Sequence, residues 1–217
     1  MVLELYQLPF SAPCRSVLMV GKILGLDIDA KPLDLMQGEH LKPEFLKINP
    51  FHCIPTLVDD GFTLWESRAI MTYLVGKFSP ENDLYPKDIQ ARATVDRWLY
   101  WDNGSLYASL GAYYGPIFRK GAKPDPSVAQ TFIDKAKLLD AALASSKYLC
   151  GDKITLADLS IMVTITTAQG AELDLSGLTN VNRWLKQLEN DFPGWWKELV
   201  TDPVEGFRGF IKSKLAQ

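Results

Sequence analysis

The chain has few cysteines and histidines and no long apolar run, and each shortage excludes a class of protein. Three of its 217 residues are cysteine and two are histidine. Because the cysteines are odd in number and lack metal-ligand spacing, they argue against a disulfide-stapled secreted fold and favour a reducing compartment. No apolar run approaches the roughly 18 residues of a transmembrane helix, and the first residues lack a secretory signal pattern. We therefore expect a cytoplasmic protein without a metal site or a membrane partner.

Basic charge is also scarce. The formal net charge is −3 and the sequence pI is about 5.4. A nucleic-acid binder would carry a basic surface, so no nucleic-acid partner is expected. The 47% content of hydrophobic residues is enough for a real core, and the length suits one large or two modest domains.

The patterning changes once along the chain. Residues 1–78 alternate strand and helix signals, residues 79–88 form a polar, proline-marked connector, and residues 89–217 read as helices. Thr155 and Asp158 have the spacing of a capping box, and the apolar run that follows predicts a central helix. We expect an α/β domain followed by an all-α domain.

Ser11 is the first candidate for chemistry. An alternating strand from Val2 leads into a proline-containing loop and then into an apolar helix, so Ser11 lies just before a helix start. Thioredoxin-like folds have the first cysteine of a C-x-x-C motif at this position, but only Cys14 is a cysteine here, which excludes a dithiol relay. A helix start and a donating hydroxyl can each lower the pKa of a thiol that a ligand supplies. The other interpretation, which this segment alone favours, is that Ser11 only caps the helix.

Residues 49–70 contain a second group of candidates. The Ile54–Pro55 bond can be cis at low cost, and an exposed backbone edge beside it could pair with an extended peptide. Two short apolar runs flank Asp60-Gly61 and predict a hairpin. Glu66 precedes a helix start and offers an acceptor for an ammonium group, while His52 offers a cation. Each residue alone could be a turn, cap or surface residue, but the ordered set predicts a socket for a small, doubly charged peptide.

These segments resemble the cytosolic glutathione transferases, most closely the serine-type delta class of insects. The resemblance extends over nearly the whole chain, and as an ordered set its motifs are specific. It is carried by Ser11–Ser16, Gly38–Leu41, Pro43–Phe45, Asn49–Pro50, His52–Leu57 and Trp65–Ile70.

The resemblance implies a thioredoxin-like domain followed by a helical bundle domain, and it implies site residues. Ser11 would be catalytic and would hold the sulfur of reduced glutathione as a thiolate. Ile54 would pair with the cysteinyl unit beside a cis-Pro55. The further glutathione-binding residues implied are His40 and His52 at the glycine carboxylate, Cys53, and Glu66, Ser67 and Arg68 at the γ-glutamyl end.

An apolar co-substrate needs an apolar binding surface. Aromatic residues near the end of the first long helix of the second domain are candidates, although aromatics at helical spacing are often plain core. With the resemblance, the predicted electrophile site comprises Ala12, Pro13, Leu35, Tyr107, Tyr113, Ile117, Phe118 and Phe207. Tyr114 and Phe210 belong to the same aromatic groups. Phe10 and Phe51 depart from the delta-class pattern, and Phe10 could reshape the site beside Ser11.

The implied function is conjugation of glutathione to apolar electrophiles for detoxification, with dehydrohalogenase or peroxidase activity as possible side reactions. Glutathione would be a co-substrate, no cofactor would be bound, and a homodimer is implied. Two alternatives remain open: a non-catalytic carrier of glutathione and apolar ligands, and a thiol reductase that uses Cys14 as its nucleophile. A translation-factor subunit with a transferase-like domain is more distant.

Overall fold

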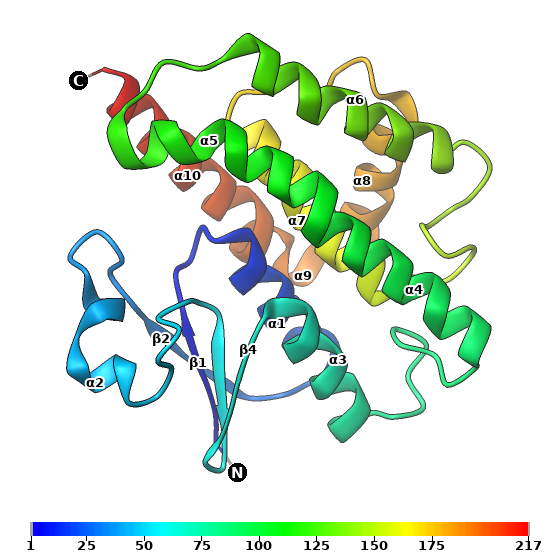
Figure 1. Ribbon diagram of the computed structural model, residues 1–217. Helices are drawn as coiled ribbons and strands as arrows, with labels where there is room; N and C mark the ends of the chain where they lie inside the picture. The colour runs from blue at the N-terminus through cyan, green and yellow to red at the C-terminus, as the bar shows by residue number, and fades with distance from the viewer. Residues whose placement is uncertain (1, 217) are drawn as a thin grey trace. The chain divides into compact units, whose positions relative to one another are not determined.

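The computed structural model describes residues 2–216, and the chain divides into two compact units, Met1–Tyr85 and Pro86–Gln217. Figure 1 labels most of their helices and strands. The elements of the first unit are β1 (Leu3–Gln7), α1 (Ala12–Leu24), β2 (Ile28–Pro32), η1 (Glu39–Leu41), α2 (Pro43–Leu46), β3 (Thr56–Asp59), β4 (Phe62–Trp65) and α3 (Ser67–Phe78).

The first unit is a four-stranded sheet with the order β2-β1-β3-β4. β1 is parallel to β2 and antiparallel to β3, and β3 is antiparallel to β4. The predicted hairpin is present, and both of its turn residues have positive φ, 49° at Asp60 and 84° at Gly61. α1 and α3 pack against one another, and the core contains fully buried Leu5, Leu57 and Ile70. This arrangement confirms the thioredoxin-like fold.

β2 was not singled out in the sequence, and its composition explains why. The strand reads IDAKP, three of its five residues are exposed, and it forms one edge of the sheet. Lys31 lies 2.5 Å from Asp29 and 3.9 Å from Glu4. Charged side chains on an edge strand discourage pairing with other chains, but they also remove the apolar alternation by which strands are recognised.

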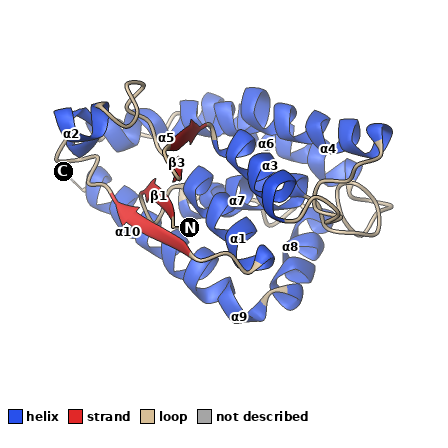
Figure 2. Ribbon diagram, turned by 90° about the horizontal axis from the view of Figure 1, so that it is seen from below, coloured by secondary structure: helices blue, strands red, loops and turns tan. Residues whose placement is uncertain are grey.

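The second unit is helical, as Figure 2 shows. Its elements are α4 (Ile89–Trp101), the π-helical segment η2 (Asp102–Tyr107), α5 (Ala108–Lys120), α6 (Pro126–Ala142), α7 (Leu156–Gly170), α8 (Thr179–Asp191), α9 (Pro193–Trp196), the π-helical segment η3 (Lys197–Thr201) and α10 (Asp202–Leu215). None of the helices within residues 2–216 is both long and apolar enough to cross a membrane.

α7 is the central helix of this unit, as its apolar sequence predicted. Nearly all of its residues are buried, and the capping box at its start is present. Asp158 accepts hydrogen bonds from the Thr155 N–H at 2.9 Å, the Leu149 N–H at 2.9 Å and the Trp184 Nε1–H at 3.0 Å. The same carboxylate therefore starts α7 and joins it to α8 and to the preceding loop.

The first long helix of this unit is less regular than expected. Between α4 and α5 its turns widen into the π-helical segment, whose first residue, Asp102, is fully buried. The Asp102 carboxylate accepts hydrogen bonds from the Ser160 hydroxyl at 2.6 Å and the Thr164 hydroxyl at 2.9 Å. Because both partners lie on α7, the irregular segment is tied to the central helix, and sequence periodicity carries no signal for such a contact.

Candidate functional site

Ser11 occupies the N-cap position of α1 but does not cap the helix with its side chain. Its backbone is extended, with φ −69° and ψ 119°, and no hydrogen bond joins its hydroxyl to the backbone of the helix. The side chain is half-buried. The capping interpretation left open by the sequence therefore has no hydrogen bond to support it, and the hydroxyl lies at a helix start, where negative charge is stabilised.

Cys14, one turn into α1, has an environment that makes its thiol unreactive. The residue is fully buried, and this burial raises the pKa of the Cys14 thiol to about 11, against the lowering effect of a hydrogen bond from Ser11. A thiol with this pKa stays protonated at neutral pH, and thiolates are the nucleophilic form. The geometry therefore argues against the thiol-reductase alternative. Ala12 is buried beside it and Pro13 is half-buried.

The loop from Asn49 to Pro55 is held by a buried amide that the sequence analysis gave no role. Asn49 is fully buried, and its Nδ2 donates to Thr56 Oγ1 at 2.8 Å and to the Cys53 carbonyl at 3.3 Å. Its Oδ1 accepts from the Phe51 N–H at 3.0 Å, and Thr56 Oγ1 donates to the Cys53 carbonyl at 2.8 Å. These bonds fix the backbone around Ile54, and the Ile54–Pro55 peptide bond is cis.

The two histidines lie close together. The ring centroids of His40, in η1, and His52 are 6.2 Å apart. His52 is exposed and has a φ of 45°, which few residues other than glycine adopt. The Nδ1 atom of His40 is buried and has no hydrogen-bond partner. Two imidazoles so arranged can share one carboxylate.

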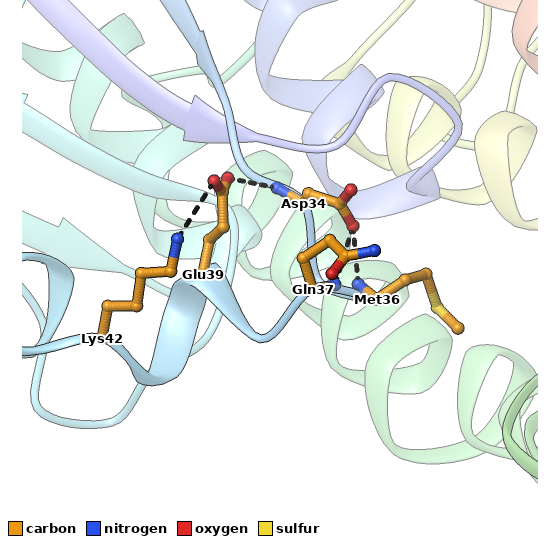
Figure 3. Close-up of polar contacts among 5 residues, drawn as sticks. All are labelled: Asp34, Met36, Gln37, Glu39 and Lys42. Carbon is orange, nitrogen blue, oxygen red and sulfur yellow. Dashed lines mark hydrogen bonds and ion pairs between the residues drawn. The ribbon is translucent and has the colours of Figure 1, made fainter.

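A network of polar contacts shapes the loop before His40 (Figure 3). Asp34 Oδ1 accepts from the backbone N–H groups of Met36 at 2.8 Å and Gln37 at 3.0 Å. Glu39 Oε2 accepts from the Asp34 N–H at 2.8 Å, and its other oxygen lies 3.5 Å from Lys42 Nζ. The loop carries half-buried Leu35, so the network positions two of the predicted site residues.

Glu66 stands out by its backbone. It immediately precedes α3, its φ is 71° and its ψ is 103°, and its side chain is exposed. The next residue, Ser67, is buried, and Arg68 Nη1 donates to Ser67 Oγ at 3.3 Å. A non-glycine residue in this region costs free energy, and such strain concentrates at binding and active sites. The carboxylate of Glu66 is thus presented to solvent between β4 and α3 by a backbone of unusual conformation.

In the helical unit, aromatic side chains of η2, α5 and α10 form what we call the aromatic wall: Tyr107, Tyr114, Phe118, Phe207 and Phe210. Its contacts are a 3.2 Å hydrogen bond between the Tyr107 and Tyr114 hydroxyls, a T-shaped Tyr114–Phe207 pair at 5.4 Å, and a Phe118–Phe210 pair at 4.9 Å. Tyr114 contacts two predicted site residues, Tyr107 and Phe207. In the sequence it belongs to the aromatic group but is not among the predicted site residues.

Two other predicted site residues are buried in the same helix. Ile117 is 1% exposed and Tyr113 is 8% exposed, so both side chains are largely packed in the core, as is Phe207 at 4%. Burial raises the pKa of Tyr113, and the nearby Glu172 carboxylate adds to the effect. Both residues therefore contribute to the packing of α5.

The two departures from the delta-class pattern differ in environment. Phe10 is half-buried, one residue before Ser11. Phe51 is 61% exposed, and its ring stacks on Trp65 at 4.8 Å. Within residues 2–216, no group of three or more His, Cys, Asp or Glu residues could hold a metal ion.

Comparison with known proteins supplies a family. Residues 1–76 match the model for the N-terminal domain of glutathione S-transferases, and residues 110–191 match the model for the C-terminal domain. A delta-class glutathione transferase of Nilaparvata lugens is 43% identical, with a TM-score of 0.93 over 98% of this chain and 99% of that one. A Bombyx mori glutathione transferase is 37% identical (TM-score 0.92, 97% and 98% covered), and an epsilon-class enzyme of the housefly Musca domestica is 34% identical (0.91, 98% and 98%).

Proposed function

The chain belongs to the glutathione S-transferase family, and from this premise we propose how its residues divide the work. The chain is a glutathione transferase with the thioredoxin-like and helical domains of that family, and it resembles the insect delta class. It joins the sulfur of reduced glutathione to electrophiles, and glutathione is a co-substrate, with no bound cofactor. Residues 1–78 would bind glutathione, residues 79–88 would connect the domains, and residues 89–217 would hold the electrophile.

Glutathione has two carboxylates, one ammonium and one thiol, and the first unit offers a complementary group to each. We assign the glycine carboxylate to His52 and His40, whose rings lie 6.2 Å apart. The backbone of Ile54, with Cys53 before it and cis-Pro55 after it, would pair with the cysteinyl unit. The γ-glutamyl end would be held by Glu66, Ser67 and Arg68 at the start of α3.

The observation that carries the mechanism is the placement of Ser11. Its hydroxyl lies at the start of α1 and makes no capping bond, and by turning from the Cys14 thiol it would donate to a sulfur brought by glutathione. A hydrogen bond to the thiolate and the positive end of the helix both favour ionisation. Catalysis then combines a larger thiolate fraction at neutral pH with proximity, which contributes about 7 to 11 kcal/mol in well-oriented cases.

In the helical unit the electrophile would be held by the aromatic wall, which belongs to the helices that also contain buried Tyr113 and Ile117. Ala12, Pro13 and Leu35 remain candidates predicted from the sequence. Aromatic rings with hydroxyl tips suit apolar substrates that carry a polar leaving group. Detoxification follows as the role, with dehydrohalogenation or peroxide reduction as further reactions of the same thiolate.

Two properties of the whole protein complete the proposal. We place it in the cytoplasm, since its three cysteines are free thiols. We also propose a homodimer, as the family resemblance implies, with exposed hydrophobic residues such as Phe51 at 61% and Tyr100 at 79% as candidates for its interface. Analytical ultracentrifugation would test the dimer, and a sedimentation coefficient typical of a monomer would refute it.

Replacement of Ser11 tests the mechanism. In an assay with glutathione and an activated aryl halide, Ser11→Ala should lower turnover about tenfold or more, because a charge-assisted hydrogen bond contributes about 1.5 to 3 kcal/mol. The KM for glutathione should change little, since both ends of the peptide stay bound. Ser11→Thr, which keeps a hydroxyl, is the matched control and should retain more activity. Equal turnover in all three proteins would remove Ser11 from the mechanism, and no turnover in the wild type would favour a carrier.

A further inference from the structure

The end of α7 approaches α10 so closely that a side chain there would fit only if its neighbours shifted. Gly170, the last residue of α7, is buried. A Cβ atom added to Gly170 would lie 3.1 Å from the Val204 carbonyl oxygen, 3.2 Å from Phe207 Cδ1 and 3.3 Å from Val204 Cγ1. The φ of Gly170 is not in the left-handed region. The close approach of α10, and not the backbone conformation, therefore calls for glycine at this position.

A second glycine meets the other end of α10. Gly121 follows α5 with a φ of 61°, and a Cβ atom on it would lie 2.9 Å from the Lys214 carbonyl oxygen. Helix α10 packs against both α5 and α7 (Figure 1). Both ends of α10 therefore pack against the end of a neighbouring helix at a glycine, which has no side chain.

This packing of α10 positions two of the five residues of the aromatic wall. Phe207 and Phe210 belong to α10, and their partners Tyr114 and Phe118 belong to α5. Because the two phenylalanines share one helix, a movement of α10 relative to α5 changes both aromatic pairs together. Gly170 touches this arrangement directly, since one of its neighbours is the Phe207 ring itself.

α10 is not confined on every side. A groove of about 350 Å³ that is open to solvent is lined on α10 by Val204, Glu205 and Arg208, and on α7 by Thr166 and Gln169. A methyl group at Gly170 needs only a few tenths of an ångström from its neighbours. Because side chains beside an open groove are less tightly packed than core residues, a small shift of α10 is favoured over disruption of the core.

We propose that Gly170 is a positioning residue for the electrophile: by letting α10 sit against the end of α7, it sets the separation of Phe207 from Tyr114. Because the buried Phe207 ring contacts the Tyr114 ring, its position sets where Tyr114 lies and thereby the size of the aromatic electrophile that the wall accepts. This inference rests on the proposed function, because it takes the aromatic wall as the electrophile site. Gly170 itself touches no substrate.

The test compares Gly170→Ala with wild type in the full-length protein, using glutathione with a single-ring and a fused two-ring aryl halide. The ratio of kcat/KM for the two halides should shift toward the larger one by about threefold to tenfold, the scale of a one-carbon change in an apolar pocket. The KM for glutathione should stay within about twofold, since a displaced α10 removes no group assigned to that peptide. Gly206→Ala and Gly209→Ala are matched controls within α10, because an added Cβ meets nothing within 4 Å at either position.

Three results would overturn the inference. One is an unchanged preference between the halides in Gly170→Ala, and another is an equal shift in the Gly206→Ala or Gly209→Ala controls. The third is a loss of activity with both halides together with a raised KM for glutathione, which would indicate a general structural effect. An inactive wild type would instead reject the proposed function, so the two failures are distinguishable.

A second variant keeps the inference testable if Gly170→Ala does not fold. Gly121→Ala would press on the other end of α10 at Lys214 and should also change the preference between halides. Gly25→Ala is its control, since Gly25 has a φ of 65° but no atom within 4 Å of an added Cβ. If neither Gly121→Ala nor Gly25→Ala changed the preference between halides, or if both changed it equally, a role for the packing of α10 would be contradicted.

Discussion

The two units of this protein hold their candidate site residues in different ways. In the first unit, the residues assigned to glutathione lie in loops and at element ends, and His52 and Glu66 have positive φ. In the helical unit, the aromatic wall consists of side chains on continuous helices that also build the core. The difference indicates that binding of glutathione can be altered with little effect on the fold, whereas the electrophile wall cannot be changed without repacking.

The largest expected effect lies in the helical unit, where a polar side chain serves the fold alone. Asp158→Ala leaves the Leu149 N–H, the Thr155 N–H and the Trp184 indole without their acceptor. We expect the free energy of unfolding to fall by about 3 kcal/mol or more, since each of the three buried donors left without a partner costs about 1 to 3 kcal/mol. Urea unfolding followed by circular dichroism would measure it.

Asp174 provides the control for that experiment. It also accepts from a backbone N–H, that of Ser176 at 3.0 Å, but it is exposed, so water can replace its bonds. Asp174→Ala should therefore lose only a small part of the stability lost in Asp158→Ala. Similar losses in the two variants would show that the Asp158 network does not hold the helical unit together.

The next effect lies in the first unit and should fall on binding. Glu66→Ala removes the acceptor assigned to the glutathione ammonium, and the Kd for glutathione should rise about tenfold, since bonds to charged groups contribute about 1.5 to 3 kcal/mol. Isothermal titration calorimetry would measure the Kd. An unaltered Kd would reassign Glu66 to the fold.

Glu66→Gly separates strain from function at the same position. Glycine adopts a φ of 71° freely, whereas alanine does not. Glu66→Gly should therefore be about 0.5 to 1 kcal/mol more stable than Glu66→Ala, after the entropy cost of glycine is subtracted from the left-handed penalty. Both variants should bind glutathione equally weakly. If the glycine variant were the less stable of the two, the backbone at Glu66 would not be strained.

The smallest effect on activity is expected for Cys14. Since burial raises the pKa of Cys14 to about 11, its thiol should resist iodoacetamide near neutral pH, and Cys14→Ala should keep full turnover. Because the folded pKa lies above the ordinary value of 9.0, the stability contributed by the neutral thiol is complete below about pH 9 and is lost as the pH rises toward 11. Mass spectrometry of alkylated protein would check the reactivity. Lost turnover in Cys14→Ala, with the fold intact, would restore the thiol-reductase alternative.

The features that depend on neighbouring residues were predictable from the sequence. The hairpin at Asp60-Gly61 and the capping box at Thr155 are set by local backbone and side-chain chemistry, and both are present. The central position of α7 followed from a helix that is apolar on all sides. These features need no knowledge of distant contacts.

The features that depend on distant contacts could not be predicted from the sequence. Strand β2 is held by its pairing with β1, and the π-helical turn at Asp102 is bonded to α7, about 60 residues later. Asn49 reads as an ordinary turn residue, although its buried amide organises the loop around Ile54. Tyr114 could have been assigned to the aromatic wall only with the knowledge that Phe207 of α10 packs against α5.

The central claim is that the Ser11 hydroxyl keeps the sulfur of bound glutathione ionised. The most direct test is a pH titration of the ultraviolet absorbance of the thiolate, with glutathione bound to wild type and to Ser11→Ala. In the wild type the pKa of the bound thiol should lie below the ordinary value of about 8.5, and in Ser11→Ala it should rise by about one unit, or 1.4 kcal/mol. The same pKa in both proteins would contradict the account.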